Sequence, residues 1–168
     1  MDFELNKTQK DIQKAVREFT RGEFDKDLVL ELERKHEFPE KIWRKACDLG
    51  LVGVHFPEEY SGQGLGCLED ILVVEELCRG DSTMGSAVAL SSFASEIVLH
   101  WGSAEMKHKY LPAVAEGRML SAGAFTEPDH GSDITSVETT GRGVRGMTGS
   151  SASGSSAARR RAERMSSA

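Results

Sequence analysis

Apolar side chains recur at three- and four-residue intervals over most of the first 118 residues, which is the spacing of one face of an α-helix. The first such stretch covers residues 8–20, and its apolar stripe consists of Ile12, Ala15, Val16 and Phe19. Gly22 lies just beyond it, where glycine commonly ends a helix. The pattern therefore predicts an amphipathic helix at the start of the chain.

Five more stretches have the pattern of helices: residues 26–37, 39–49, 67–80, 83–101 and 103–116. Pro39 suits a first helical position, Ser103 suits an N-cap, and Gly50 and Gly117 suit helix ends. Residues 51–56 are expected to be a short extended piece. Residues 57–66 are expected to be a loop, because three glycines fall within five positions there.

The pattern changes after residue 118. The segment MLSAGAFTEP, residues 119–128, is expected to be the first strand of a β-rich unit. We therefore predict a mainly α fold in three parts. Residues 1–118 form an all-α helical bundle, residues 119–140 begin a β-domain, and residues 141–168 form a disordered tail.

The tail has an unusual composition. Of its 28 residues, 23 are Ser, Gly, Ala or Arg, and it contains no Leu, Ile, Phe, Tyr or Trp. Such a sequence cannot build a hydrophobic core. Two interpretations stay open: a flexible, basic linker or tail, or an artificial junction or shifted reading frame after about residue 140.

Charge and cysteine usage narrow the function classes. The formal charge is −6, but residues 1–140 hold 15 Lys and Arg against 26 Asp and Glu, while the tail holds six Arg against one Glu. An acidic body argues against nucleic acid as the main partner. The three cysteines lack metal-ligand spacing and are expected to be buried free thiols. The four histidines before residue 110 also lack such spacing, and Trp43 and Trp101 are expected in the core.

No feature of the sequence points to export or to a membrane. The start, MDFELNKTQKDI, lacks a basic region followed by an apolar run, so it does not resemble a secretory signal. No apolar run approaches the roughly 18 residues that a membrane span needs. We therefore expect a cytoplasmic protein without a membrane span.

The segment GAFTEPDHGSD, residues 123–133, is the strongest candidate for chemistry. It has the composition of a turn, with Pro128 presetting φ and Gly131 expected to take a positive φ. The same turn would expose the hydroxyls of Thr126 and Ser132 beside backbone N–H groups. Such a group of donors suits a phosphate or the polar edge of a flavin.

The turn resembles the flavin-contacting signature of the acyl-CoA dehydrogenases, in which Thr-Glu-Pro and two variable residues precede Gly-Ser-Asp. Two further stretches are similar to that family in the same order. They are DLGLVGVHFPEEYSGQGLG, with Ser61 where the family has Gly, and GSAEMKHKYLPAVAEG, with Val114 at a Leu position. The resemblance covers roughly residues 3–140.

The resemblance implies FAD as cofactor and assigns roles by position. Thr126 would hydrogen-bond the flavin ring, Phe125 would pack at its edge, and Ser132 would reach the diphosphate and lie near the acyl-CoA. Gly123 and Ala124 would belong to the strand beside the cofactor. His130 and Asp129 fall in the variable pair and are expected to be solvated.

The acyl pocket is implied less directly. In this family the helix equivalent to residues 83–97 lines that pocket. Ser86, Ala89 and Phe93 fall on one helical face by spacing, so they are the candidate substrate-binding residues, with plain core packing as the alternative.

The reaction that the resemblance implies is α,β-dehydrogenation of an acyl-CoA, with an electron-transfer flavoprotein as electron acceptor and a homotetrameric full-length enzyme. The catalytic base of the family lies in a C-terminal half with no counterpart here, so no catalytic residue is assigned. We expect a truncated chain with weak or no FAD binding and no turnover. The alternatives are an acyl-CoA oxidase or related flavin enzyme, a non-catalytic acyl-CoA-binding helical module, and an interaction protein that uses the basic tail.

Overall fold

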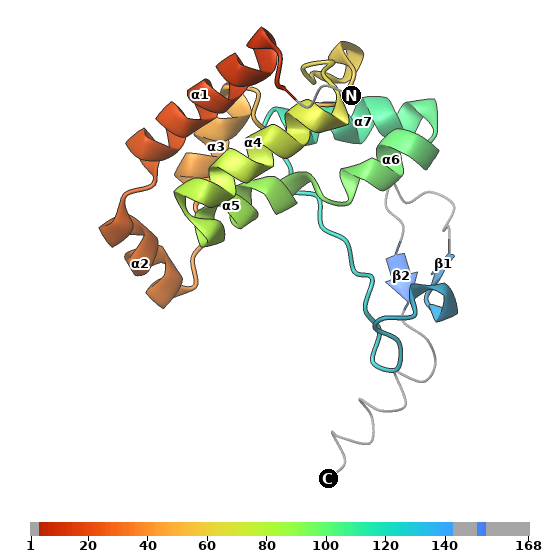
Figure 1. Cartoon of the computed structure of the whole chain (residues 1–168). Helices are drawn as coiled ribbons and strands as arrows, with labels where there is room; N and C mark the ends of the chain where they lie inside the picture. Colours follow the sequence, from red (N-terminus) through yellow and green to blue (C-terminus); the bar gives the residue numbers. More distant parts are fainter. Residues whose placement is uncertain (1–3, 143–150, 154–168) are drawn as a thin grey trace. The chain divides into compact units, whose positions relative to one another are not determined.

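The structure is a computed structural model that describes residues 4–142 and 151–153 of the 168-residue chain. It divides into two compact units, Met1–Gly123 and Ala124–Ala168. The first unit is helical (Figure 1), and its elements in chain order are α1 Lys7–Glu23, α2 Lys26–Lys35, α3 Glu40–Asp48, the 3₁₀ turn η1 Glu58–Tyr60, α4 Cys67–Gly80, α5 Ser82–Ala89, the 3₁₀ turn η2 Leu90–Ser92, α6 Ser95–Trp101 and α7 Ala104–Ala115.

Side-chain caps fix where several helices begin. Asn6 Oδ1 accepts a hydrogen bond from the Gln9 N–H at 2.9 Å, and Gln9 Oε1 accepts one from the Asn6 N–H at 3.0 Å, so α1 starts with a capping box. Asp25 and Asp81 cap α2 and α5 with a side-chain oxygen that accepts from two backbone N–H groups of the first turn. Ser103 accepts from the Met106 N–H at 3.2 Å, which confirms the predicted start of α7.

The core of the first unit lies where α4 is covered by α1 on one side and by α5 on the other (Figure 1). Val16 of α1 and Leu77 of α4 are fully buried there. Phe56, from the loop that follows α3, and Leu111 of α7 are fully buried as well. Burial of a side chain of this size contributes about 1.5–3 kcal/mol, so the amphipathic stripes predicted from the sequence are what holds this unit together.

Residues 83–101, predicted as one helix, form two helices separated by η2. Ser91 Oγ donates to the Val88 carbonyl at 2.6 Å, and Ser92 Oγ donates to the Ala89 carbonyl at 3.5 Å. Hydroxyls that bond to carbonyls of the preceding turn compete with the helical pattern and bend it. The break therefore falls where two serines follow one another.

Helix ends and the loop after α3 also differ from expectation. Gly22 lies inside α1, whose C-cap is Phe24, so the helix is longer than predicted. Residues 51–56 are not extended, because the Phe56 N–H turns back to the Gly53 carbonyl at 3.0 Å and Gly53 has φ +70°. Gly117, with φ +67°, follows the end of α7 as predicted.

Two predicted burials are wrong. Trp43 is in the core, but Trp101 is 85% exposed at the end of α6. Cys47 is buried and Cys78 half-buried, whereas Cys67 is exposed at the first position of α4. Trp101 and Cys67 are apolar residues within predicted helices. Their residue type alone does not show whether they lie on the helix face that packs against the core.

The stretch Ser82–Trp101 is long and apolar enough to cross a membrane by length and composition alone, which the sequence analysis did not expect. It is the one such stretch among the described residues. A core helix passes the same test, and here the stretch is interrupted by η2 and packs on α4 through α5. Composition is therefore weak support for a membrane span.

The second unit differs most from prediction. Residues 119–128 contain no strand, because the described residues offer them no neighbouring strand with which to form a ladder. The unit holds the 3₁₀ turn η3 Ile134–Ser136 and a short antiparallel pair, β1 Thr140–Arg142 and β2 Ser151–Ser153, with Thr140 opposite Ser153. Residues 141–142 and β2 fall within the tail 141–168 that was predicted to be disordered, and the remainder of that tail lies outside the described residues.

Candidate functional site

The segment TEPDHGSD folds into a closed turn. The Glu127 N–H donates to the His130 carbonyl at 2.8 Å, and the His130 N–H donates back to the Glu127 carbonyl at 3.3 Å. Pro128 and Asp129 occupy the two central positions, where proline's fixed φ favours the bend. The turn predicted from the sequence is therefore present, although Gly131 is not among the residues with positive φ.

The carboxylate of Glu127 holds this turn against the chain that follows η3. Its Oε1 accepts from the Thr139 N–H at 2.7 Å and from the Thr139 hydroxyl, and its Oε2 accepts from the Glu138 N–H at 2.9 Å. These hydrogen bonds, that from the Thr139 hydroxyl above all, lower the pKa of Glu127. Glu127 is thus engaged in shaping the turn.

The carboxylate of Asp133 also accepts hydrogen bonds from the residues that follow it. It caps η3 by accepting from the Thr135 N–H at 3.1 Å, from the Thr135 hydroxyl at 2.5 Å and from the Ser136 hydroxyl. The hydrogen bond from Ser136, then those from Thr135, lower its pKa. The carboxylates of Glu127 and Asp133 are therefore both occupied by hydrogen bonds within the turn and the residues that follow it.

The five residues predicted to contact a flavin are all exposed: Gly123, Ala124, Phe125, Thr126 and Ser132. Thr126 lies beside Gly131, since a Cβ on Gly131 would come within 4.0 Å of Thr126 Cγ2. Among the described residues neither the Thr126 nor the Ser132 hydroxyl has a hydrogen-bond partner. Two hydroxyls near a glycine form a surface that can donate to a phosphate or to a ring carbonyl.

A second candidate site lies in the helical unit. A cavity of about 420 Å³ is lined by apolar side chains from α5, η2 and α6 and from the loop before α4, and it includes the predicted residues Ala89 and Phe93. Ser86 lies outside this cavity, and its hydroxyl is 3.9 Å from Cys78 Sγ between α5 and α4. Two of the three residues predicted from one helical face, Ala89 and Phe93, therefore line the same cavity, on either side of the break at η2. Ser86 instead faces α4.

One wall of this cavity is ionic. His55 Nε2 hydrogen-bonds to Glu96 Oε1, and His55 Nδ1 lies 3.4 Å from Asp70 Oδ1. His100 Nε2 lies 3.5 Å from the other oxygen of Glu96. Asp70, followed by Glu96, raises the pKa of His55, against burial, which lowers it. Sequence reasoning missed this group, because His55 is 15 positions from Asp70 and 41 from Glu96.

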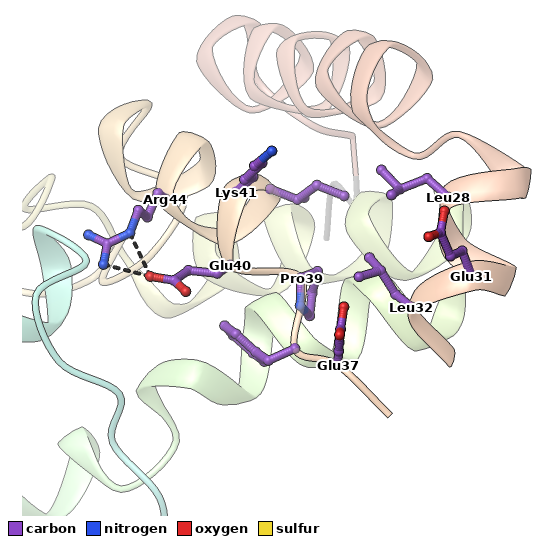
Figure 2. A pocket seen from close by; sticks show the side chains of 10 residues that line it. Leu28, Glu31, Leu32, Glu37, Pro39, Glu40, Lys41 and Arg44 are labelled. Carbon is purple, nitrogen blue, oxygen red and sulfur yellow. Dashed lines mark hydrogen bonds and ion pairs between the residues drawn. The ribbon is translucent and has the colours of Figure 1, made fainter. Parts of the chain in front are cut away.

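A third hollow, of about 510 Å³, lies between α2 and α3 and contains none of the predicted residues (Figure 2). Leu28 and Leu32 of α2 line one side of it, and Pro39 lies at the start of α3. At its edge Arg44 Nη2 is 2.8 Å from Glu40 Oε1. Among the described residues no group of three or more His, Cys, Asp or Glu side chains could hold a metal ion.

Comparison with known proteins matches the helical unit to a family model. The model described as acyl-CoA dehydrogenase, N-terminal domain, matches residues 6–118. An acryloyl-CoA reductase (NADH) of Anaerotignum propionicum is 34% identical over 83% of this chain and 35% of its own length. An acyl-CoA dehydrogenase of Mycobacterium tuberculosis is 35% identical over 78% of this chain and 34% of its own. The chain therefore spans about a third of the length of the curated relatives it matches.

Solved structures give the same picture. A glutaryl-coenzyme A dehydrogenase in complex with glutaryl-CoA superposes with a TM-score of 0.76 at 32% identity, over 84% of this chain and 36% of that one. An acyl-CoA dehydrogenase of Bacillus anthracis complexed with FAD has a TM-score of 0.67 at 33% identity, over 82% of this chain and 24% of that one. A chain from a study of the electron transferring flavoprotein of Acidaminococcus fermentans has a TM-score of 0.75 at 36% identity, over 84% and 37%.

Proposed function

Because this chain belongs to the acyl-CoA dehydrogenase family, we propose that it is the N-terminal part of an enzyme that uses FAD to dehydrogenate the α,β bond of an acyl-CoA thioester. The match of residues 6–118 to the family's N-terminal domain carries this proposal. The exposed hydroxyls of the turn at residues 126–132 support it, since they lie where the family signature places its flavin contacts.

The residues of this chain have binding roles in the proposed reaction. Thr126 donates a hydrogen bond to the flavin ring, Ser132 donates to the diphosphate, and Phe125, which is 41% exposed, packs at the ring edge. Glu127 and Asp133 hold these groups in place through the hydrogen bonds of the turn. FAD supplies the hydride acceptor when it is bound.

Acyl-group binding is proposed for the cavity at η2. The small side chain of Ala89 leaves room there, and Phe93 contributes an apolar wall that is half exposed. Ser86 is the weaker candidate because it lies outside the cavity. We propose no catalytic base within this chain, so these 168 residues on their own do not turn over substrate and bind FAD weakly.

Other properties of the proposed enzyme follow from the family. They are an electron-transfer flavoprotein as electron acceptor and a homotetrameric assembly of the longer enzyme. The cytoplasmic location stays a proposal that rests on the sequence alone. An acyl-CoA oxidase of the same superfamily is the alternative, and rapid reoxidation of the reduced enzyme by oxygen would favour it.

The experiment is a chimera in which residues 1–140 replace the matching third of the Mycobacterium tuberculosis relative. We expect a yellow protein that keeps FAD through dialysis. Thr126→Ala and Ser132→Ala each remove one hydrogen bond, which costs about 1–2 kcal/mol, and should weaken FAD binding about 5- to 30-fold. Asp129→Asn, at an exposed position of the same turn, is the matched control and should leave FAD affinity unchanged. A folded, colourless chimera that takes up no added FAD would refute the proposal.

A further inference from the structure

A histidine in the helical unit lies between carboxylates that come from two different helices. His55 belongs to the loop after α3, Asp70 to α4 and Glu96 to α6. Each ring nitrogen faces one carboxylate, Nε2 in a hydrogen bond to Glu96 and Nδ1 at 3.4 Å from Asp70. The side chain of His55 is only 18% exposed, so solvent screens these contacts weakly.

The helix that carries Glu96, α6, is weakly packed against the rest of the helical unit. α6 has seven residues and packs mainly on α7. Ser95 is its fully buried residue among those described, and Val98 and Leu99 are partly buried against the core. Ile97 is 50% and Trp101 85% exposed. A short helix with little buried apolar surface opens easily. The contact between Glu96 and His55 ties it to the side of the bundle that holds α4.

We propose that His55 is a protonation-dependent latch, which in its charged form holds α6 to the loop and to α4 and in its neutral form releases one of the two carboxylates. A neutral imidazole carries one N–H, whereas the imidazolium carries two. Only the charged ring can therefore donate to Asp70 and Glu96 together. The neutral ring leaves one partly buried carboxylate without its counter-charge.

The direction of the pH dependence follows from the environment of His55. Asp70 and then Glu96 raise its pKa in the folded protein, with burial acting against them. The latch therefore contributes fully to the stability of the closed helical unit below the pKa that His55 has in the unfolded chain. This contribution is lost as the pH rises through the pKa that His55 has in the folded protein. The other titratable groups that face the cavity are Cys67 of α4 and His100 of α6, and His100 is the second partner of Glu96.

Opening of the latch alters the cavity that holds Ala89 and Phe93, because His55, Asp70 and Glu96 line it as well. Raising the pH should loosen the wall formed by α6 while leaving α1 and α4 intact. This inference does not depend on the proposed function, since it concerns the helical unit alone.

The test is an NMR titration of the complete 168-residue chain, observing the histidine side-chain nitrogens and the amide hydrogen exchange of α6. We expect both His55 nitrogens to be protonated at low pH, with a midpoint above that of the same residue in the chain unfolded in urea. Exchange of the α6 amides, corrected for its intrinsic pH dependence, should rise through the same midpoint. The rise should be about tenfold for each unit by which the pKa of His55 falls when α6 opens.

Two variants complete the design. His55→Gln cannot take a charge, so its α6 amides should exchange rapidly and independently of the His55 midpoint. His100→Gln, which alters the exposed histidine on the same carboxylate, should keep the wild-type transition. Should His55→Gln fail to fold, the wild-type titration decides alone. A His55 midpoint at or below that of His55 in the unfolded chain, or α6 exchange that is flat through the midpoint, would overturn the latch.

Discussion

At the scale of single residues, a carboxylate lies fully buried in the helical unit. The side chain of Glu76 on α4 has no exposed surface, and Arg17 of α1 donates to both its oxygens, from Nε at 2.8 Å and from Nη2 at 2.5 Å. Arg79 Nη1 lies farther away, at 3.7 Å. The hydrogen bonds from Arg17 are the main reason that the pKa of Glu76 is lowered. A buried carboxylate is tolerated here because it is paired.

Arg17→Leu should therefore lower the free energy of unfolding at neutral pH by about 3 kcal/mol, because it leaves the Glu76 charge buried. The double variant Arg17→Leu with Glu76→Leu should recover much of this loss. Urea unfolding measures the free energy of unfolding of the single and of the double variant. In the wild type the contribution is present above the unfolded pKa of Glu76 and is lost as the pH falls through the lowered, folded pKa.

The control is Arg21→Leu, which alters an exposed arginine that lines a hollow together with Arg17 and Glu76. It should change the unfolding free energy by no more than about 0.5 kcal/mol. If Arg17→Leu were as harmless as Arg21→Leu, the buried pair would not contribute to stability.

Glu127 gives a second prediction at this scale. Glu127→Gln replaces the charged acceptor of the Glu138 and Thr139 N–H groups by a neutral one. Charge-assisted hydrogen bonds are roughly twice as strong as neutral ones, so these two amides should lose protection from hydrogen exchange. Asp129→Asn, at the exposed position two residues after Glu127, should leave the protection of both amides unchanged.

The wild-type turn should also loosen as the pH falls through the lowered pKa of Glu127, because protonation removes the charged acceptor. Protection of both amides that is insensitive to Glu127→Gln and to acid would show that the turn is held by other contacts.

The residue scale also separates what sequence reasoning can reach from what it cannot. The turn at Glu127 was predictable, since Pro128 and the bonds between Glu127 and His130 are local. The contacts around His55 were not, because Glu96 is 41 positions away and meets it only after the helices have packed. Contacts between residues so far apart form through tertiary packing, and no regular spacing in the sequence indicates them.

At the scale of elements, α4 and α5 approach each other closely at Gly85. A Cβ at Gly85 would lie 2.5 Å from the backbone nitrogen of Cys78 and 2.6 Å from its Cα. Backbone atoms cannot rotate out of the way, so the two helices can be this close only with glycine there. Helix periodicity predicted both elements but not this contact, because Gly85 lies within a run of small residues.

Gly85→Ala should therefore force α5 away from α4 and lower the free energy of unfolding by about 1–3 kcal/mol. Gly22→Ala is the matched control. Gly22 lies in α1 with nothing within 4 Å of its added Cβ, so alanine there should stabilise the chain by about 0.5–1 kcal/mol. Thermal unfolding of both variants gives the comparison. Equal effects of the two substitutions would contradict the close approach of α4 and α5.

At the scale of the whole molecule, one apolar stripe of the helical unit faces solvent. Leu90, Phe93, Ile97 and Trp101 recur at helical spacing along η2 and α6, and each is at least half exposed. The relatives of this chain are more than twice its length, since 140 matched residues make up only 35% of one relative and 131 only 34% of another. We expect the remaining domains of an acyl-CoA dehydrogenase to cover this stripe. We expect the same domains to supply the neighbouring strand that residues 119–128 lack among the described residues.

The most direct measurement is anaerobic addition of an acyl-CoA to the chimera, while its flavin absorbance is recorded. We expect the acyl-CoA, but not free CoA, to bleach the absorbance band of the oxidised flavin. A chimera that holds FAD in full occupancy, yet is bleached by no acyl-CoA that the unaltered Mycobacterium tuberculosis relative oxidises, would contradict it.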